Sequence, residues 1–263
     1  MKITLFTSNK PRHNYLINFL SKICKKLYVI QECGTVFPGY FSGSYPIGNI
    51  INKYFKQVHL AEKKIFKKKF IFCSNATLYP VQSGDLNKIK LNEIKSFLES
   101  DLYIVFGSSY IKGPLVNFLI KKKAINIHMG VSPYYRGTDC NFWALYDNNP
   151  ELVGSTIHFL SKGIDSGKII AHAVSEEHQD PFIYTMSTVK SAFFLIKKII
   201  KNKSIKKINS FIQDKNKEIR YSRAREFNEN MIKNFFKKKN FLKHKKKYNL
   251  LNTYRLSKKK FFL

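Results

Sequence analysis

An asparagine and a histidine, Asn126 and His128, lie two positions apart at the end of a short apolar run, residues 124–128. Side chains two apart on an extended strand face the same way, so a strand over this run would present an amide beside an imidazole. In an open parallel sheet the carboxyl ends of the strands border the crevice in which ligands bind. An isolated Asn-x-His pair at a strand end is more often structural, so its surroundings must be weighed.

Two turn-rich segments follow the pair. One holds Pro133 and the Tyr-Tyr-Arg-Gly turn at residues 134–137, and the other is the loop 163–167, in which glycines flank a single acid, Asp165. Glycines allow a backbone to approach a ligand closely, and loops on a rigid scaffold often carry function. These surroundings favour a functional site. His158 lies on an expected strand and is interpreted as a packed residue.

The elements that would position this site alternate along the chain. Strand-like runs are expected at residues 3–7, 28–31, 70–73, 102–106, 124–128, 155–159 and 169–174. Helical patterns are expected at residues 13–26, 49–67, 91–100, 112–122, 140–146 and 184–201. Strands alternating with helices of this length predict an α/β fold with a doubly wound, mostly parallel sheet. The last two strands could form a hairpin, and residues 34–48 form a Gly- and aromatic-rich loop.

Composition limits the class of protein. The chain has 263 residues and is 44% hydrophobic, enough for a sizeable core. Its apolar runs fall well short of the ~20 residues that a membrane span needs, and residues 1–10 resemble a first strand more than a signal peptide. A cytoplasmic protein is therefore expected. The four cysteines lie far apart without metal-ligand spacing, which argues against a zinc site or a disulfide framework.

The net charge of +30 must be interpreted with care, because only six of the 47 basic residues are arginine. AT-rich codon usage would produce that lysine excess without selection for RNA binding, and arginine is the usual bidentate phosphate ligand. Residues 201–263 hold 21 basic and four acidic residues. We therefore expect a domain at residues 1–203 and a lysine-rich, mainly helical extension at 204–263. The extension could bind RNA, mediate a homodimer or be partly disordered.

Several motifs in one order resemble the catalytic region of the folate-dependent formyltransferases, the family that includes methionyl-tRNA, glycinamide ribonucleotide and amino-sugar N-formyltransferases. The matching residues are Asn126, His128, Pro133, Tyr135, Arg136, Gly137, Gly154, His158, Asp165, Gly167, Ile169 and Ile170. The resemblance extends over residues 102–174 and more loosely back to residue 1. It implies the Rossmann-like fold of that family and an enzyme that uses 10-formyltetrahydrofolate as formyl donor.

The resemblance also implies catalytic roles for Asn126, His128 and Asp165. An amine attacking a formyl carbon creates an oxyanion, to which an Asn126 amide can donate. His128 could stabilise that oxyanion or manage the amine proton, and Asp165 would orient a water and favour a protonated His128. No metal and no covalent intermediate are required. The folate contacts implied by the resemblance are Phe106, Gly107, Ser108, Ser109, Tyr110, Ile111, Gly163 and Ile164.

The acceptor amine is less constrained. The segment after the first strand, TSNKPRHNY, has none of the glycines of the ribonucleotide enzymes' phosphate loop, and residues 204–263 look unlike the β-rich C-terminal domain of the tRNA enzymes. The form HMGVSPYYRG most resembles proteins of surface-polysaccharide pathways, which implies an amino sugar carried on a nucleotide. Expected acceptor contacts are Lys10, Arg12, His13, Tyr135 and Arg136; Arg136 could equally brace its turn. Two alternatives remain: a methionyl-tRNA formyltransferase whose basic extension holds tRNA, and a non-catalytic nucleic-acid-binding relative.

Overall fold

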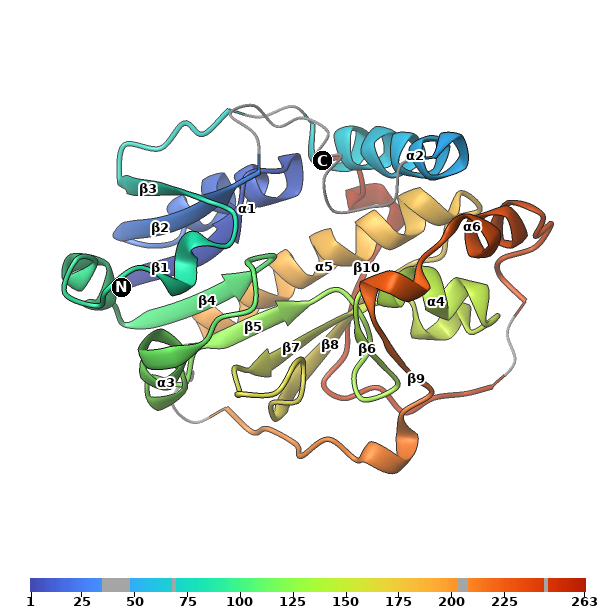
Figure 1. Cartoon of the computed structure of the whole chain (residues 1–263). Helices are drawn as coiled ribbons and strands as arrows, with labels where there is room; N and C mark the ends of the chain where they lie inside the picture. The colour runs from blue at the N-terminus through green and yellow to red at the C-terminus, as the bar shows by residue number, and fades with distance from the viewer. Residues whose placement is uncertain (35–47, 68–69, 203–207, 244–245) are drawn as a thin grey trace. The chain divides into compact units, whose positions relative to one another are not determined.

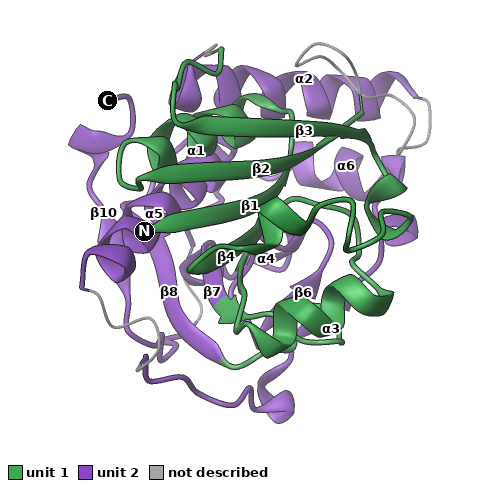
Figure 2. Ribbon diagram, turned by 90° about the vertical axis from the view of Figure 1, so that its left-hand side faces the viewer, with its two compact units in different colours: residues 1–41, 68–128, 158–168 green, residues 42–67, 129–157, 169–263 purple. Residues whose placement is uncertain are grey.

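The computed structural model describes the 263-residue chain except for residues 35–47, 68–69, 203–207 and 244–245. Most of the predicted loop at residues 34–48 therefore lies outside the described residues. The chain divides into two compact units (Figure 2): residues 1–41, 68–128 and 158–168 form the first unit, and residues 42–67, 129–157 and 169–263 form the second. Neither unit ends at residue 203, after which the sequence analysis placed a domain boundary. That boundary stays a prediction.

The first unit is built on a parallel sheet with strand order β5-β4-β1-β2-β3. Its elements (Figure 1) are β1 (Lys2–Ser8), α1 (Pro11–Ser21), β2 (Lys26–Cys33), β3 (Ala76–Gln82), the 3-10 turns η1 (Asp85–Asn87) and η2 (Lys95–Leu98), β4 (Leu102–Phe106), α3 (Gly113–Lys121) and β5 (Ile125–His128). The central strands β1 and β4 are buried almost throughout, as strands covered on both faces must be.

One face of this sheet packs against α3. Phe6 of β1 and Tyr103 of β4 share a buried cluster with Leu115 and Leu119 of α3. The spacing of four residues puts the two leucines on one side of the helix, and their burial ties α3 to the strands. The loop that connects β4 to α3 is therefore anchored at both ends by core packing.

The second unit contains a short sheet in the order β10-β8-β7 and a separate pair, β6-β9. Its elements are α2 (Asn49–Phe66), β6 (Tyr135–Gly137), α4 (Cys140–Tyr146), η3 (Pro150–Leu152), β7 (Ser155–Phe159), β8 (Ile169–Ser175), α5 (Pro181–Lys201), η5 (Lys215–Lys217), β9 (Arg220–Ser222), η6 (Ala224–Glu226), α6 (Glu229–Phe236), β10 (Tyr254–Leu256) and η7 (Lys258–Lys260). The last two residues of β7 fall in the first unit. β10 pairs with β8, and β9 with β6, in parallel.

An aromatic cluster forms much of the core of the second unit. The Tyr54 ring lies 5.2 Å from Phe227 and 5.9 Å from Phe235, both from the C-terminal extension. Phe142 of α4 lies 4.9 Å from Phe227 in an edge-to-face contact, the arrangement that ring quadrupoles favour. Phe227 and Phe235 are essentially inaccessible to solvent. The lysine-rich extension thus contributes core residues to the second unit.

The predicted fold class is confirmed: the sheet is mostly parallel, and strands alternate with helices along the chain. Residues 102–106, 140–146 and 155–159 form the expected elements with the expected bounds. The suggested connection of the last two strands also holds, since β7 and β8 are neighbours and the Phe159 N–H donates to the Lys168 carbonyl at 3.0 Å. In the described part of the extension, α6 is the only α-helix, and β9 and β10 were not predicted.

Two predicted elements of the first unit are wrong. Residues 70–73 form no strand; Phe70 and Phe72 are 60% and 83% exposed, and the Asn18 side chain bonds to their main chain as a neighbouring strand would. The edge strand of this sheet, β3, was not predicted; it contains Pro80, which cannot donate to a sheet. Residues 91–100 form a series of turns that includes η2, not a helix.

No helix in the described part of the chain is long and apolar enough to cross a membrane. All four cysteines are free thiols, of which Cys140 is buried.

A buried histidine of β8 connects two loops of the second unit. The His172 Nε2–H donates to the Ser132 carbonyl at 2.8 Å, and its Nδ1 accepts from the Leu251 N–H at 2.8 Å. The second bond requires the neutral ring, because a protonated Nδ1 cannot accept. Burial lowers the pKa of His172 from 6.5 to about 4, against a smaller raising effect of the bond to Ser132.

This depressed pKa predicts a loss of stability in mild acid. Because the folded-state pKa lies below the unfolded value, the contribution is complete above pH 6.5 and is lost as pH falls from 6.5 toward 4. Between pH 7.5 and 5 we expect the free energy of unfolding to fall by about 2 kcal/mol from this group. Urea unfolding of the wild type and His172→Gln, which keeps one donor and one acceptor, measures it. An equal pH dependence in both proteins would contradict the assignment.

Candidate active site

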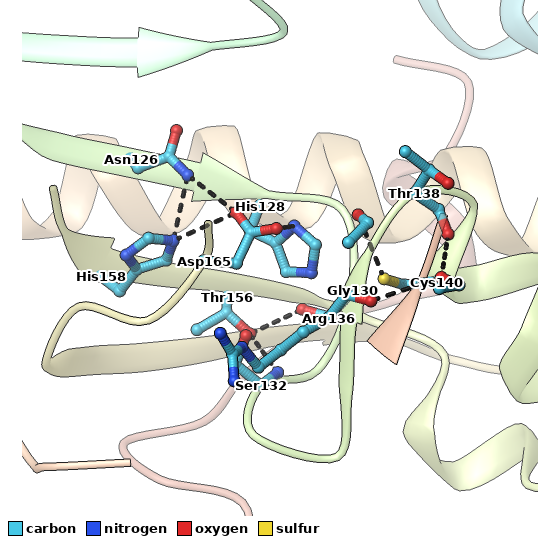
Figure 3. Close-up of polar contacts among 12 residues, drawn as sticks. Asn126, His128, Gly130, Ser132, Arg136, Thr138, Cys140, Thr156, His158 and Asp165 are labelled. Atoms are coloured by element: carbon cyan, nitrogen blue, oxygen red, sulfur yellow. Dashed lines mark hydrogen bonds and ion pairs between the residues drawn. The ribbon is translucent and has the colours of Figure 1, made fainter. Parts of the chain in front are cut away.

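Four polar side chains of the first unit converge (Figure 3): Asn126 and His128 from β5, His158 from the end of β7, and Asp165 from the loop that follows. Asp165 contacts all three others. Its Oδ2 lies 3.2 Å from His128 Nδ1, and its Oδ1 lies 3.4 Å from Asn126 Nδ2 and 3.7 Å from His158 Nε2. The alternation of β5 therefore does present Asn126 and His128 to one acid.

The donor and acceptor nitrogens of His158 follow from its partners. Its Nδ1 lies 2.8 Å from the Phe159 carbonyl, which can only accept, so this nitrogen carries the proton. The Asn126 amide nitrogen, which can only donate, lies 3.0 Å from Nε2, so Nε2 is the acceptor of this bond. One N–H of the amide is thus held by His158. The second, turned toward Asp165 at 3.4 Å, is only weakly bonded and can donate to another acceptor.

His128 and Asp165 form a nearly buried pair, with 7% and 13% of their side chains exposed. The carboxylate accepts from Nδ1 of the ring, so this bond sets the orientation of the imidazole. Nε2, on the opposite side of the ring, is the position from which His128 can exchange a proton with a reacting group.

The main chain of the loop that carries Asp165 passes close to the end of β7. Asp165 itself has a φ of +48°, in the left-handed region that aspartate tolerates better than most residues. A Cβ atom on Gly167 would lie 1.7 Å from the Phe159 carbonyl oxygen, so only glycine fits there. The Ser161 and Ser166 hydroxyls, 2.9 Å apart, join the two sides of the loop. The glycine lets the chain return tightly enough to aim the carboxylate at β5.

The family model described as formyl transferase matches residues 58–193, just over half of the 263-residue chain. The chain belongs to the formyl transferase family. All four converging residues lie inside the matched segment, as does the β4–α3 loop.

Individual relatives agree with this assignment. The methionyl-tRNA formyltransferase of Desulforamulus reducens is 34% identical over 98 residues, which are 36% of this chain and 31% of that protein. The chain spans about a third or less of the length of the curated relatives it matches. Among solved structures, the phosphoribosylglycinamide formyltransferase of Anaplasma phagocytophilum has a TM-score of 0.52 at 17% identity, covering 81% of this chain and 93% of that one. A sugar N-formyltransferase from a Shewanella species has a TM-score of 0.50 at 15% identity, covering 81% and 73%. These two structures show the shared fold.

The residues predicted to contact folate form two loops of the first unit. Gly107, with a φ of +68°, begins the β4–α3 loop, whose Tyr110 is 49% exposed. Phe106 and Ile111 are buried in the core, so contacts from them would come from their main chain. Ile164 is 41% exposed beside Gly163 in the second loop. The Tyr110 hydroxyl donates to the Lys162 carbonyl and so links the two loops.

Three predicted acceptor contacts lie at the start of α1. Lys10 is the N-cap residue, and its main-chain N–H donates to Nδ1 of His13 at 3.2 Å. His13 is 1% exposed and lies 4.9 Å from the Phe106 ring. Burial first, and then the charges of Arg12 and Lys10, lower the pKa of His13 well below 6.5. His13 is therefore a neutral core residue, and its predicted contact with an acceptor would require the ring to move.

The other two predicted acceptor contacts belong to β6 of the second unit, which pairs with β9. The Tyr135 hydroxyl bonds to Asp147 and Asn149, at 3.2 Å and 2.7 Å. Arg136 is ion-paired with Glu218 at 2.8 Å and lies 5.4 Å from the Tyr221 ring. These bonds favour the turn-bracing role of Arg136; acceptor contact by either residue stays a prediction.

The structure adds His158 to the predicted residues, because it contacts both Asn126 and Asp165. Its place in the Gly-x-Thr-x-His motif, next to the loop that carries Asp165, is the signal in the sequence that could have identified it. Interpreted as a strand residue alone, it was assigned to the core. It is buried, but its Nε2 faces the site.

Proposed function

We propose that this protein is an N-formyltransferase that moves the formyl group of 10-formyltetrahydrofolate to the primary amine of a nucleotide-linked amino sugar. The observation that carries the proposal is the convergence of Asn126, His128 and Asp165 in a chain of the formyl transferase family. In the reaction the amine nitrogen forms a bond to the formyl carbon, the bond from that carbon to folate N10 breaks, and one proton passes from the amine to the departing tetrahydrofolate.

Asn126 is suited to stabilise the negative charge that develops on the formyl oxygen. His158 occupies one of its amide N–H groups and so fixes the amide plane. The other N–H is only weakly engaged by Asp165, at 3.4 Å, and can donate to the oxyanion from this fixed orientation. A fixed donor in a site with little water needs no reorganisation when the charge appears, and such donors supply about 2.7–4 kcal/mol of transition-state stabilisation.

His128 is suited to transfer the proton of the attacking amine. Its Nδ1–H is held by Asp165, and its Nε2 can take the proton of the attacking amine and return it to the leaving nitrogen. The carboxylate balances the charge that the imidazole carries between these two events. Asn126 thus acts on the formyl oxygen, and His128 acts on the nitrogen atoms that lose and gain the proton.

The two loops of the first unit fit a flat heterocycle. Within the described residues the main-chain N–H groups of Ser108, Tyr110 and Ile111 donate to no other residue, so a ligand that reaches the loop could accept from them. When bound, the formyl donor supplies the activated one-carbon unit; the loops hold and orient it.

Two observations support an amino sugar as acceptor. A sugar N-formyltransferase shares the fold. The extension also packs unlike a separate β-rich domain of the kind that tRNA formyltransferases carry, because β9 pairs with β6, β10 pairs with β8 and Phe227 lies in the core of the second unit.

The second candidate acceptor is an aminoacylated initiator tRNA. The methionyl-tRNA formyltransferase relative and the exposed lysines of the extension, such as Lys237, Lys239 and Lys243, favour it. Truncation after residue 203 is a poor test, because it would remove Phe227 and Phe235 from the core.

The decisive experiment follows tetrahydrofolate release with a panel of nucleotide amino sugars and with charged initiator tRNA. We expect turnover with one sugar, little affected by salt, and unchanged in a triple Lys→Gln variant at Lys237, Lys239 and Lys243. A matched triple variant at the exposed Lys88, Lys90 and Lys95 of the first unit is the control.

A tRNA enzyme would give a different pattern. Its affinity would fall steeply with salt, and each lysine that contacts a phosphate would lower the logarithmic slope by about 1 on removal. Turnover with tRNA alone, weakened only by the first triple variant, would overturn the sugar assignment. If the protein binds tetrahydrofolate but formylates neither class of acceptor, the proposal would hold for the formyl donor but not for the acceptor.

A further inference from the structure

A buried glutamate of β2 holds the β4–α3 loop, residues 107–112. Glu32 is 2% exposed. Its Oε2 accepts from the Ser109 N–H at 2.5 Å, and its Oε1 accepts from the Ser109 hydroxyl at 2.7 Å and from the Gly84 N–H at 2.9 Å. Burying a carboxylate is costly unless its lone pairs meet donors, and here three neutral donors meet them.

Asn87 of η1 holds the same loop further along. Its Nδ2 donates to the Tyr110 carbonyl at 2.7 Å, and its Oδ1 accepts from the Lys112 N–H at 2.7 Å. Glu32 lies near the carboxyl end of β2, and Asn87 lies in η1, shortly after the neighbouring strand β3. We call these two residues the loop clamp. The clamp fixes the main chain of the loop at residues 109, 110 and 112.

The clamp also determines which donors the loop offers. It occupies the N–H groups of Ser109 and Lys112, while those of Ser108, Tyr110 and Ile111 bond to nothing else in the described part of the chain. A loop with several unpaired main-chain donors is not held in one conformation by its own hydrogen bonds. Side chains outside the loop must then restrain it. Glu32 and Asn87 supply that restraint.

We propose that Glu32 and Asn87 are positioning residues for the formyl donor, which hold the free main-chain N–H groups of the loop in the arrangement that the pterin ring requires. This rests on the proposed function. An acid at the end of β2 could instead bind a ribose, as in dinucleotide-binding folds. Both oxygens of Glu32 are already engaged with Ser109 and Gly84, which favours the positioning role.

The test is Glu32→Gln in the full-length protein. Whichever way the amide is oriented, its NH₂ group meets the Ser109 N–H or the Gly84 N–H, so one donor faces another. We expect the Kd for tetrahydrofolate and the KM for 10-formyltetrahydrofolate to rise about tenfold, with kcat and the acceptor KM within about twofold of wild type. Asn87→Ala, at an exposed position, should raise the same two constants about threefold or more.

Matched controls remove similar bonds elsewhere in the first unit. Glu93→Gln changes an exposed glutamate that accepts from the Lys90 N–H, and Asn75→Ala removes an amide that donates to the Ser21 and Cys24 carbonyls. Both should leave tetrahydrofolate affinity unchanged.

The outcomes separate the two proposals. A wild-type protein that binds no tetrahydrofolate would refute the proposed function itself. A wild type that binds it, with affinity unchanged in both clamp variants or with kcat lowered in place of a raised KM, would overturn the clamp. If Glu32→Gln does not fold, Asn87→Ala alone decides.

Discussion

Asn126→Ala is expected to lower kcat by about 10²–10³-fold, the usual effect of removing one oxyanion donor. The alanine deletes the amide that His158 holds at 3.0 Å and leaves the His128–Asp165 pair in place. Proton transfer therefore survives while stabilisation of the formyl oxygen is lost. Formyl transfer at saturating concentrations of both substrates measures the effect, and the Kd for tetrahydrofolate should change less than threefold.

Two further variants make this result specific. Asn18→Ala removes an amide of the first unit that bonds to the main chain of Phe70 and Phe72, and it should leave kcat unchanged. Asn126→Asp keeps the shape but brings a second carboxylate to about the 3.4 Å that now separates the amide from Asp165, so it should be at least as inactive as the alanine variant. Wild-type kcat in Asn126→Ala would exclude Asn126 as the oxyanion donor.

The fold was largely predictable because periodicity identifies elements whose burial is regular. β4 is buried at every position, and its bounds were predicted correctly. The errors occur where tertiary contacts override the local preference of a segment. The run at residues 70–73 has strand composition, but Asn18 takes the place of a pairing strand. β3 tolerates Pro80 because it is an edge strand, and no sequence pattern specifies that position.

The site was predictable only in part, for a similar reason. Two-residue alternation places Asn126 beside His128, but only the family resemblance connects them with Asp165, which lies 39 positions beyond Asn126 in the chain. His158 was assigned to the core because its position on an expected strand predicts a buried side chain. That position alone does not show whether a buried side chain also belongs to the site. Glu32 gave no signal, because its role arises from a contact with Ser109, 77 positions away. Contacts of such long sequence separation are specified by the fold, not by local pattern.

Asp165→Asn is expected to lower kcat by about 10²–10⁴-fold without destabilising the protein, which separates catalysis from packing at this position. The amide has the shape of the carboxylate but cannot accept at both ends. If its oxygen keeps the bond to His128 Nδ1, its NH₂ group replaces Oδ1, which now makes only long contacts, 3.4 Å to the Asn126 amide nitrogen and 3.7 Å to His158 Nε2. Because contacts of this length are weak, the melting temperature should change little. The negative charge that balances His128 during proton transfer would nevertheless be gone.

The matched control is Asp101→Asn, whose exposed carboxylate accepts from the Lys2 N–H at 2.8 Å in the same unit. It should change neither kcat nor the melting temperature by much. For Asp165→Asn, thermal unfolding and steady-state kinetics on one preparation give both readouts. Loss of activity with loss of folding would mean that Asp165 chiefly holds its loop to β5, whereas loss of activity in a fully stable protein is the result expected if its charge is what His128 requires.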